Sequence, residues 1–277
     1  MRPRQWTKNL LVVAAPALSG RLLEADVVLG TLVAFATFSI AASGIYLVND
    51  VLDVELDRAH PRKQHRPIAA GLVSPGLATG VAVVLLLAAP ALSLLATTDL
   101  AIVVAIYEGF SLVYSLALKD EPVIDIAIVA SGFLLRAIAG GAATGIALSQ
   151  WFLLSAAFGS LFMASGKRYA ESRMEGDLTA MRKSLGRYTQ TYLRFVWTLS
   201  ATVLVMTYGL WAFEQGERSG SILPAASMAP FVIAVLRYAV DVDAGRADEP
   251  EEIALGDRVL QLLAISWLVL LAIAIYL

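Results

Sequence analysis

Long apolar stretches with few charged side chains constrain this chain of 277 residues more than any other feature. Short polar segments such as Thr97–Asp99 separate them. A helix needs about 20 apolar residues to cross the hydrocarbon core of a bilayer, and the runs have roughly that length. The predicted helices cover residues 9–23, 26–48, 76–97, 99–118, 123–145, 149–166, 190–213, 222–240 and 257–277. The sequence therefore predicts an all-α, polytopic bundle of about nine transmembrane helices.

The composition agrees with a membrane protein. Hydrophobic residues make up 58% of the chain and charged residues only 16%, whereas a soluble domain has about 25% charged residues. The helices and their short connections leave no room for a soluble domain, so we expect one transmembrane domain over residues 1–277. Because the chain has no cysteine, disulfides, thiolate metal sites and a cysteine nucleophile are excluded.

The basic residues lie mainly at one end of the predicted bundle. Arg21 and Arg218 are at the opposite end, Arg136 is inside a helix, and the other eighteen of the 21 Lys and Arg share one side. That side consists of the N-terminal segment and the connections with their adjoining helix ends, at 49–75, 119–122, 167–189 and 241–256. By the positive-inside rule this side is cytoplasmic. We expect a multi-pass protein of the inner (plasma) membrane with a cytoplasmic N-terminus.

The densest group of acidic residues, in "NDVLDVELD", directly follows the second apolar run. If the helix continues through it, 100° per residue brings four side chains within an arc of about 100° and leaves Glu55 outside. These four are Asn49, Asp50, Asp53 and Asp57. Grouped carboxylates repel one another, and Mg²⁺ relieves this by taking oxygen ligands while keeping positions for substrate phosphates. The pattern favours a Mg²⁺ site, and a solvated acidic helix end is the alternative.

Basic residues follow the acidic segment at once, namely Arg58, Arg62, Lys63 and Arg66. Guanidinium and ammonium groups bind phosphate oxygens. We therefore expect carboxylates to hold Mg²⁺, Mg²⁺ to hold a diphosphate, and these basic side chains to reach its remaining oxygens. His60 and His65 are interpreted as loop residues.

Two further clusters lie on the same side of the predicted bundle. In "YSLALKDEPVID", Lys119 is in a short turn and Asp125 lies just inside the next helix, where it is a helix-start carboxylate or a metal or ribose ligand. In "SGKRYAE", Lys167 and Arg168 are membrane anchors or phosphate ligands. The same alternatives hold for the N-terminal residues Arg4, Lys8 and Asn9, and Tyr188 is interpreted as an interfacial aromatic.

Two charged residues, Glu108 and Arg136, lie deep inside predicted membrane helices. A lone charge at such depth costs several kcal/mol, on the order of 3 on insertion scales, so each is expected to have a partner. Counted from the turn at 119–122, the two have comparable depths in neighbouring antiparallel helices. We expect them to pair, and contact of Arg136 with a substrate phosphate is the alternative.

At these motifs the chain resembles the UbiA superfamily of intramembrane prenyltransferases, whose members have about nine helices and two Asp-rich motifs around a Mg²⁺-diphosphate. "NDVLDVELDR" is similar to the first motif. The second motif departs from the usual Asp-x-x-x-Asp, because Val129 stands four residues after Asp125. The departure weakens the expectation of a second metal cage of the usual kind.

Four segments are more similar to one branch of that superfamily, the decaprenyl-phosphate phosphoribosyltransferases of the actinobacterial cell-wall arabinan pathway. They are "RPRQWTKNLLVVAAP", "DRAHPRKQHRPIAAG", "YSLALKDEPVIDIAIVASGFLLRAIAGG" and "SGKRYAE". The resemblance implies transfer of phosphoribose from 5-phosphoribosyl 1-diphosphate to a polyprenyl phosphate lipid, with release of diphosphate.

The resemblance also implies roles for the residues already singled out. Asn49, Asp50, Asp53 and Asp57 would bind Mg²⁺ and diphosphate, with Lys119 and Asp125 beside them in catalysis. The substrate-binding set would be Lys8, Asn9, Arg58, Arg62, Lys63, Arg66, Tyr114, Lys167 and Arg168. The expected partners are the two substrates and the lipid bilayer, with no nucleic acid, and a homo-oligomer stays open.

Two other functions stay open from the sequence. The first is a UbiA-type enzyme that prenylates an aromatic or glycerol-phosphate acceptor. The second is a transporter for an anionic metabolite, which should carry its binding residues near the middle of several helices. Because most of the charged residues lie at one face instead, the pattern favours an enzyme.

Overall fold

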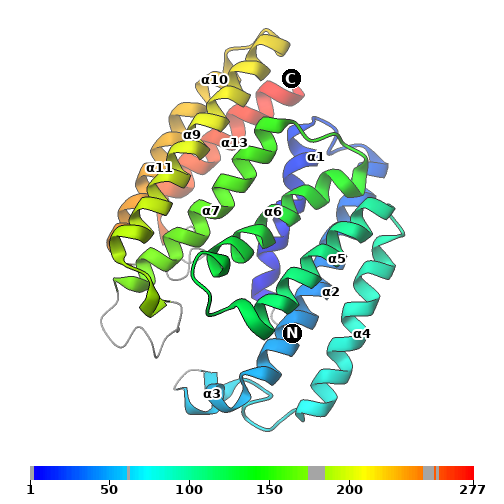
Figure 1. Ribbon diagram of the computed structural model, residues 1–277. Coiled ribbons are helices and arrows are strands. Elements are labelled where there is room, and N and C mark those ends of the chain that lie inside the picture. The colour runs from blue at the N-terminus through cyan, green and yellow to red at the C-terminus, as the bar shows by residue number, and fades with distance from the viewer. Residues whose placement is uncertain (1–2, 61–62, 174–184, 246–252, 254–255) are drawn as a thin grey trace. The chain divides into compact units, whose positions relative to one another are not determined.

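The computed structural model describes residues 3–60, 63–173, 185–245, 253 and 256–277. Every regular element in these residues is helical (Figure 1). The elements are η1 (Pro3–Val13), α1 (Ala14–Leu18), α2 (Ala25–Leu52), α3 (Val54–Ala59), η2 (Lys63–His65), α4 (Pro75–Ser93), α5 (Thr98–Val113), η3 (Tyr114–Leu118), α6 (Ile124–Thr144), α7 (Gln150–Ser172), η4 (Leu185–Arg187), α9 (Gln190–Ser219), α10 (Leu223–Ala226), α11 (Met228–Asp243) and α13 (Arg258–Tyr276).

Short polar side chains begin several of the long helices. Each accepts a hydrogen bond from a backbone N–H of the first helical turn, which has no partner within the helix. The capping residues are Ser74 of α4, Thr97 of α5, Ser149 of α7, Thr189 of α9 and Asp257 of α13. These caps explain why the apolar runs become separate helices at the polar breaks of the sequence.

Seven helical segments among the described residues are long and apolar enough to cross a membrane, so the expectation of an all-α membrane protein is confirmed. They are Ala25–Leu52, Pro75–Ser93, Thr98–Leu118, Ile124–Thr144, Gln190–Ser219, Leu223–Asp243 and Arg258–Tyr276. Two predicted runs are not among them. The run 9–23 forms mostly the 3-10 helix η1 and the short α1, and the run 149–166 lies in α7. The count of nine spans and the cytoplasmic N-terminus stay predictions.

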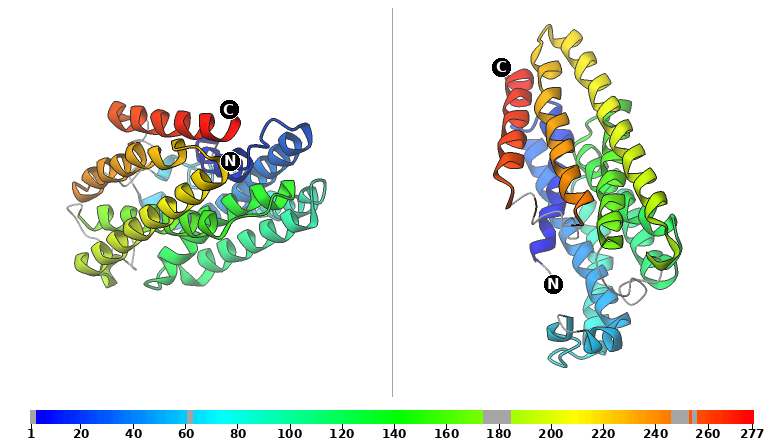
Figure 2. Two further views of the ribbon diagram at one scale, coloured as in Figure 1. Left: turned by 90° about the horizontal axis from the view of Figure 1, so that it is seen from above. Right: turned by 90° about the vertical axis from the view of Figure 1, so that its left-hand side faces the viewer.

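The chain forms two compact units. The first unit comprises residues 1–118 and 135–147, and the second comprises 119–134 and 148–277, so α6 contributes its start to the second and its end to the first. Phe38, Leu100 and Tyr107 are in the core of the first unit. The core of the second contains Phe162 and Trp197, and its helices α9, α11 and α13 lie side by side (Figure 2). The single domain over 1–277 stays a prediction.

Glycines let backbones approach closely within the first unit. A Cβ at Gly140 of α6 would lie 2.0 Å from the carbonyl oxygen of Val12 in η1. A Cβ at Gly30 of α2 would lie 2.7 Å from the carbonyl oxygen of Ala143. Small residues of this kind permit close helix packing in membranes. Gly140 thus allows η1, and Gly30 allows α2, to lie against the C-terminal half of α6.

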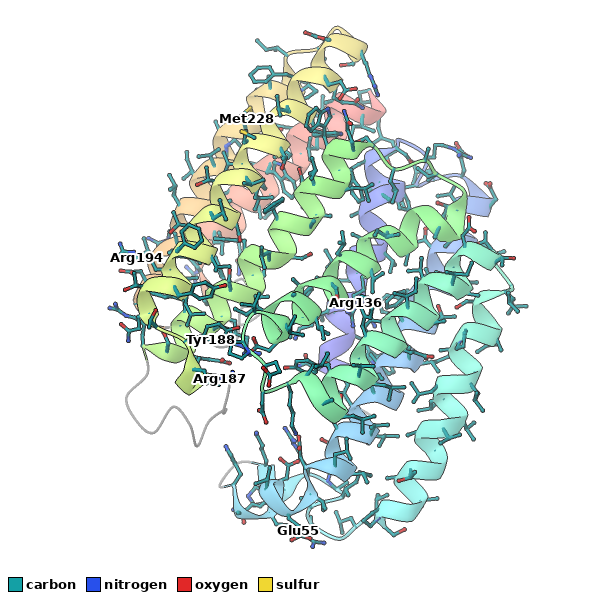
Figure 3. All side chains as sticks on the ribbon, in the orientation of Figure 1. Glu55, Arg136, Arg187, Tyr188, Arg194 and Met228 are labelled. Carbon is teal, nitrogen blue, oxygen red and sulfur yellow. The ribbon has the colours of Figure 1, made fainter. Side chains whose placement is uncertain are left out.

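The buried Arg136 of α6, labelled in Figure 3, has partners from η1 and α5. Its Nε donates to Oδ1 of Asn9 at 2.7 Å, and its Nη2 donates to the hydroxyl of Tyr107 at 3.0 Å. The guanidinium also lies 4.7 Å from the Tyr107 ring centroid. Asn9 is fully buried, and its Nδ2 donates to Ser39 at 3.0 Å. The guanidinium is therefore balanced by an amide, a hydroxyl and an aromatic ring.

The expected pair of Glu108 and Arg136 is wrong. No ion pair joins the two residues, although both are described, and Oε1 of Glu108 is buried without a hydrogen-bond partner there. Tyr107 precedes Glu108 by one position, which is about 100° around α5. The rotation of α5 about its axis places Tyr107, and not Glu108, toward Arg136. Equal depth in the membrane does not determine this rotation.

A double-mutant cycle on thermal stability in detergent checks this assignment. Arg136→Met removes a charge-assisted hydrogen bond to Asn9, so we expect it to couple with Asn9→Ala by about 1 kcal/mol. The cycle of Arg136→Met with Glu108→Gln should be additive to within about 0.5 kcal/mol. Coupling in the Glu108 cycle and none in the Asn9 cycle would contradict this assignment and show that Glu108 and Arg136 form an ion pair.

Candidate active site

The acidic segment lies where α2 ends and α3 begins. Asp53 separates the two helices with φ −97° and ψ 12°, outside regular helix geometry. The hydrogen bonds nevertheless continue, because the N–H of Asp53 donates to the carbonyl of Asn49 at 2.9 Å and that of Asp57 donates to the carbonyl of Asp53 at 2.8 Å. Residues 49–57 therefore keep nearly the helical spacing that the sequence predicts.

Asp50 and Asp57 converge on one cation, Arg66. Nη1 of Arg66 donates to Oδ1 of Asp50 at 3.2 Å and to Oδ2 of Asp57 at 2.5 Å. Asp57 is 2% exposed and Asp50 is 9% exposed. A spacing of seven residues is close to two helical turns, so the two carboxylates share one face. Glu55 (Figure 3) is exposed on α3 and takes no part in this contact, as predicted, and it accepts a hydrogen bond from Arg58 at 2.8 Å.

The donor set of this segment suits a hard divalent cation. Two buried carboxylates already direct oxygens at a single positively charged nitrogen, and the half-buried Asn49 and Asp53 supply further oxygens from the same segment. The described residues contain no ready-made group of three acidic or histidine side chains around a metal position. A cation at Asp50 and Asp57 would thus have to take the place of the Arg66 guanidinium.

The other basic residues of the first unit differ in their exposure. Arg58 is exposed, and its Nε donates to the carbonyl of Ala69 at 3.2 Å. Lys63 is also exposed, as are both histidines of the loop. Arg62 lies outside the described residues. Arg58 and Lys63 are accessible to a soluble anion, and their substrate roles stay predictions.

A second buried carboxylate, Asp125, lies in the second unit. It is fully buried at the start of α6. Nε of Arg168 donates to its Oδ2 at 3.2 Å, and the hydroxyl of Tyr188 donates to its Oδ1 at 2.5 Å. Arg168 also binds Glu171 at 2.8 Å. Arg168 is 5% exposed, so it is a buried partner of two carboxylates and not a side chain that reaches for the membrane surface.

The hydroxyl of Tyr188 bonds both Asp125 and a strained turn at Val123. The sequence-based interpretation of Tyr188 as an interfacial aromatic did not include this role. Val123 has φ +71°, which is costly for a β-branched residue, and its N–H donates to the Tyr188 hydroxyl. Burial, followed by the hydrogen bond to Asp125, raises the pKa of the Tyr188 phenol. The hydroxyl stays protonated and keeps donating to Asp125. Because 63 residues separate Tyr188 from Asp125, no local sequence pattern predicts their contact.

The remaining predicted site residues have varied surroundings. Both polar atoms of the Asn9 amide are engaged inside the first unit, and its role with a substrate stays a prediction. Lys167 lies 3.9 Å from Glu171. Tyr114 is in the π-helical turn η3, and Lys119 follows it in the next turn. Lys8, Tyr114 and Lys119 are half-buried, and each is engaged with other groups.

Replacement of Tyr188 by Phe removes the hydroxyl that holds both Asp125 and Val123. We expect backbone hydrogen exchange in residues 119–125 to become at least about fivefold faster, because a buried hydrogen bond contributes about 1 kcal/mol. Mass spectrometry of the corresponding peptide measures this rate.

Tyr192→Phe provides the matched control. Tyr192 stacks on Tyr188 with ring centroids 5.7 Å apart, so both variants keep that stack. No hydrogen bond of the Tyr192 hydroxyl occurs among the described residues. Equal exchange in the two variants would contradict the role given to the Tyr188 hydroxyl.

Known proteins resemble this chain over nearly its whole length. The model of the UbiA prenyltransferase family matches residues 10–256. The decaprenyl-phosphate phosphoribosyltransferase of Mycobacterium tuberculosis (strain CDC 1551 / Oshkosh) is 57% identical over 280 residues, which cover 99% of this chain and 92% of that protein. The protein of the same name from Corynebacterium glutamicum is 52% identical over 283 residues, covering 100% and 85%.

Solved structures share the fold at low sequence identity. The structure of a UbiA homolog from Archaeoglobus fulgidus bound to GPP and Mg²⁺ gives a TM-score of 0.72 at 15% identity, over 99% of this chain and 97% of that one. The family match, the close relatives and the shared fold agree with one another. The chain belongs to the UbiA prenyltransferase family.

Proposed function

We propose that this protein transfers the 5-phosphoribosyl group of 5-phosphoribosyl 1-diphosphate to a polyprenyl phosphate, decaprenyl phosphate by the name of its relatives. The observation that carries the proposal is 57% identity with a decaprenyl-phosphate phosphoribosyltransferase along 99% of the chain. The product would be a phosphoribosylated lipid, a precursor in cell-wall arabinan synthesis. A soluble sugar diphosphate and a membrane lipid would meet at the cytoplasmic face of the plasma membrane.

The reaction exchanges one C–O bond for another. The bond from the anomeric carbon to the diphosphate breaks, and its electron pair leaves with the diphosphate. An oxygen of the lipid phosphate forms the new bond from the opposite face of the ribose. Because an ionised phosphate is already a nucleophile, the protein needs no strong general base. Its residues contribute positioning and charge neutralisation.

The acidic segment of the first unit is assigned to the diphosphate. Asp50 and Asp57, with Asn49 and Asp53 from the same segment, would hold a divalent cation, Mg²⁺ in this proposal. When bound, the cation neutralises the charge that develops on the leaving diphosphate. The convergence of Asp50 and Asp57 on a single nitrogen supports this assignment.

Arg66 has two roles in this account. In the structure its guanidinium neutralises Asp50 and Asp57 through two hydrogen bonds. If Asp50 and Asp57 held a cation, the Arg66 guanidinium would bind phosphate oxygens instead, for which its planar donors are suited. Arg58 and Lys63 are assigned to phosphate oxygens as well, together with Arg62 and with Lys119 of the turn before α6.

The cluster of the second unit is assigned to substrate positioning. Tyr188 and Arg168 hold both oxygens of Asp125, so the carboxylate has one fixed orientation. We assign Asp125 to the ribose hydroxyls, and Lys8 and Lys167 to the phosphate of the lipid or the 5-phosphate of the sugar.

A transfer assay with defined substrates tests the proposal. Purified protein is incubated with 5-phosphoribosyl 1-diphosphate labelled in the ribose, decaprenyl phosphate and Mg²⁺. We expect the label to enter the organic phase and the transfer to stop when EDTA is added. An unlabelled organic phase, together with turnover of a prenyl diphosphate and an aromatic acceptor, would instead identify an ordinary prenyltransferase.

Two variants of neighbouring residues locate the chemistry within that assay. Asp53→Asn removes a charge with almost no change in volume and should lower kcat at least about 100-fold, because it weakens neutralisation of the leaving group. Glu55→Gln removes a charge two positions away on the outward face and should keep kcat within about twofold. Equal losses would place the acidic segment outside the reaction. Similar melting temperatures show that both variants remain folded.

A further inference from the structure

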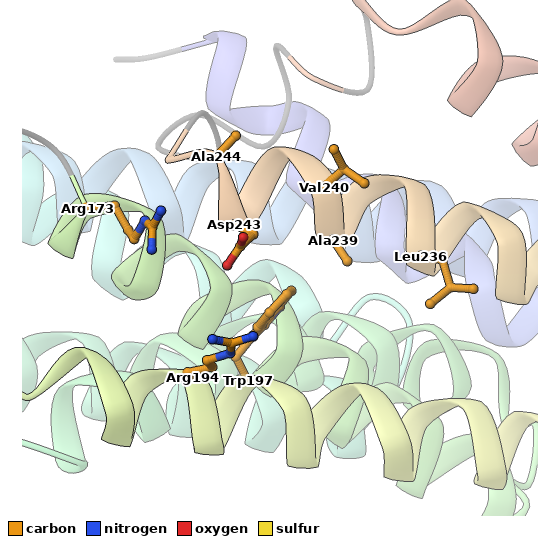
Figure 4. A pocket seen from close by; sticks show the side chains of 8 residues that line it. All are labelled: Arg173, Arg194, Trp197, Leu236, Ala239, Val240, Asp243 and Ala244. Atoms are coloured by element: carbon orange, nitrogen blue, oxygen red, sulfur yellow. The ribbon is translucent and has the colours of Figure 1, made fainter.

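A hollow in the second unit has no part in the proposed reaction. It is a shallow, largely open hollow of about 540 Å³ where the end of α7, the start of α9 and the end of α11 meet. Its polar lining consists of Arg173, Arg194 and Asp243, and the ring of Trp197 lies beside them (Figure 4). Leu236, Ala239, Val240 and Ala244 of α11 and its C-terminal end complete the lining.

The two guanidinium groups are available for an anion. Arg173 and Arg194 are both exposed, and neither has a carboxylate partner within the described part of the chain. Asp243 is held otherwise, since the hydroxyl of Tyr169 donates to its Oδ1 at 3.0 Å. Among the lining residues that the structure describes, two cations and one carboxylate give a formal charge of +1. A phosphodiester, with its single negative charge, matches that balance.

The wall of the hollow is built from packed side chains. Tyr169 is buried and stacks on Trp197, with ring centroids 5.6 Å apart and planes 7° from parallel. The guanidinium of Arg173 lies 6.0 Å from the Tyr169 ring centroid. The Cβ of Arg173 is also close to the backbone of Gly245, where an added Cβ would lie only 3.3 Å from it. These contacts fix the base of the Arg173 side chain at the edge of the hollow.

The polar groups lie at the ends of candidate membrane-spanning helices, where lipid headgroups are expected. Arg173 caps the C-terminus of α7, Arg194 is in the first turns of α9, and Asp243 is the last residue of α11. Leu236 precedes Asp243 by seven residues, which is about 10 Å along a helix at ~1.5 Å per residue. Because α9 and α11 are membrane-spanning segments by length and composition, the apolar wall runs into the hydrocarbon and the charged end meets the headgroups.

Arg194 lines a second hollow of about 450 Å³ as well. This one follows the outer face of α9 and is lined, besides Arg194, by Thr191, Phe195, Thr198, Leu199 and Thr202. Two shallow apolar tracks therefore start from one guanidinium, one along α11 and one along α9. A lipid with two acyl chains fits this branching, whereas a polyprenyl phosphate has a single chain.

We propose that Arg173 and Arg194 form a binding site for the phosphate of an anionic diacyl phospholipid, whose two chains follow α11 and α9. A headgroup hydroxyl of a phosphatidylglycerol donates to Oδ2 of Asp243, the oxygen that Tyr169 leaves free. The lipid is a resident ligand of the second unit. The site is independent of the proposed transfer reaction, because it contains none of the residues assigned to it.

Native mass spectrometry of the full-length protein, released from detergent with added phosphatidylglycerol, tests the site. We expect one tightly retained lipid on the wild type and about tenfold weaker binding in Arg194→Gln, because a charge-assisted hydrogen bond is lost. Arg173→Gln should weaken it likewise, and Arg194→Lys should retain part of the affinity. Arg218→Gln, at the other end of α9, is the matched control and should bind as the wild type does.

Three results would overturn the proposal. Unchanged retention in both the Arg173 and the Arg194 variants would place the lipid elsewhere. Equal retention of phosphatidylethanolamine would contradict selection for an anionic headgroup. Displacement of phosphatidylglycerol by decaprenyl phosphate would assign the hollow to the acceptor lipid, whereas simultaneous retention of one molecule of each supports a separate phospholipid site. Melting temperatures without added lipid establish that the variants are folded.

Discussion

The contact of Arg66 with Asp50 and Asp57 is the interaction on which the candidate active site depends. Two carboxylates this close to each other and this deeply buried are unstable without a positive charge between them, since each has lost most of its hydration. The connection after α3 supplies that charge. It turns back through η2, and Gly71, with φ +77°, redirects the chain before Ser74 caps α4. The loop thus returns a cation to the helix face that carries the acids.

The same principle organises the other charges within each unit. Asp125 is balanced by Arg168 and Tyr188, and Arg136 is held by Asn9 and Tyr107. Glu108, with one oxygen lacking a partner among the described residues, is the exception. In a chain with so few charged residues, each partnership fixes the position of a helix as well as the charge itself. The polar clusters are therefore structural even where we assign them a role with substrate.

Local periodicity made part of the site predictable. Asp50 and Asp57 differ by seven positions, so the helical repeat alone places them on one face and leaves Glu55 outside, as the structure shows. The long apolar runs likewise identified the membrane helices, because length and hydropathy are properties of a segment by itself. The first run was less predictable. It forms the 3-10 helix η1, and the close approach that Gly140 gives it cannot be read from local pattern.

Contacts between segments that are distant in the sequence explain why the pairing of Arg136 and the role of Tyr188 were not predicted correctly. The rotation of α5 decides whether Tyr107 or Glu108 meets Arg136, and that rotation depends on contacts with α2 and α6. Tyr188 reaches Asp125 from the segment before α9, so its role follows only from the folded second unit. Arg66, by contrast, was foreseen as a phosphate ligand, whereas the structure shows it as the counter-ion of the carboxylates. Arg66 would fill both roles if a divalent cation replaced its guanidinium at Asp50 and Asp57 in the substrate complex.

The position of a divalent cation in the substrate complex tests that exchange most directly. A crystal of the full-length protein with 5-phosphoribosyl 1-diphosphate and Mn²⁺ in place of Mg²⁺ reveals the cation by its anomalous scattering. The account predicts a peak at coordination distance, about 2.0–2.3 Å, from oxygens of Asp50 and Asp57, with the Arg66 guanidinium moved onto a phosphate oxygen. A cation bound elsewhere, with Arg66 still between the two carboxylates, would contradict it.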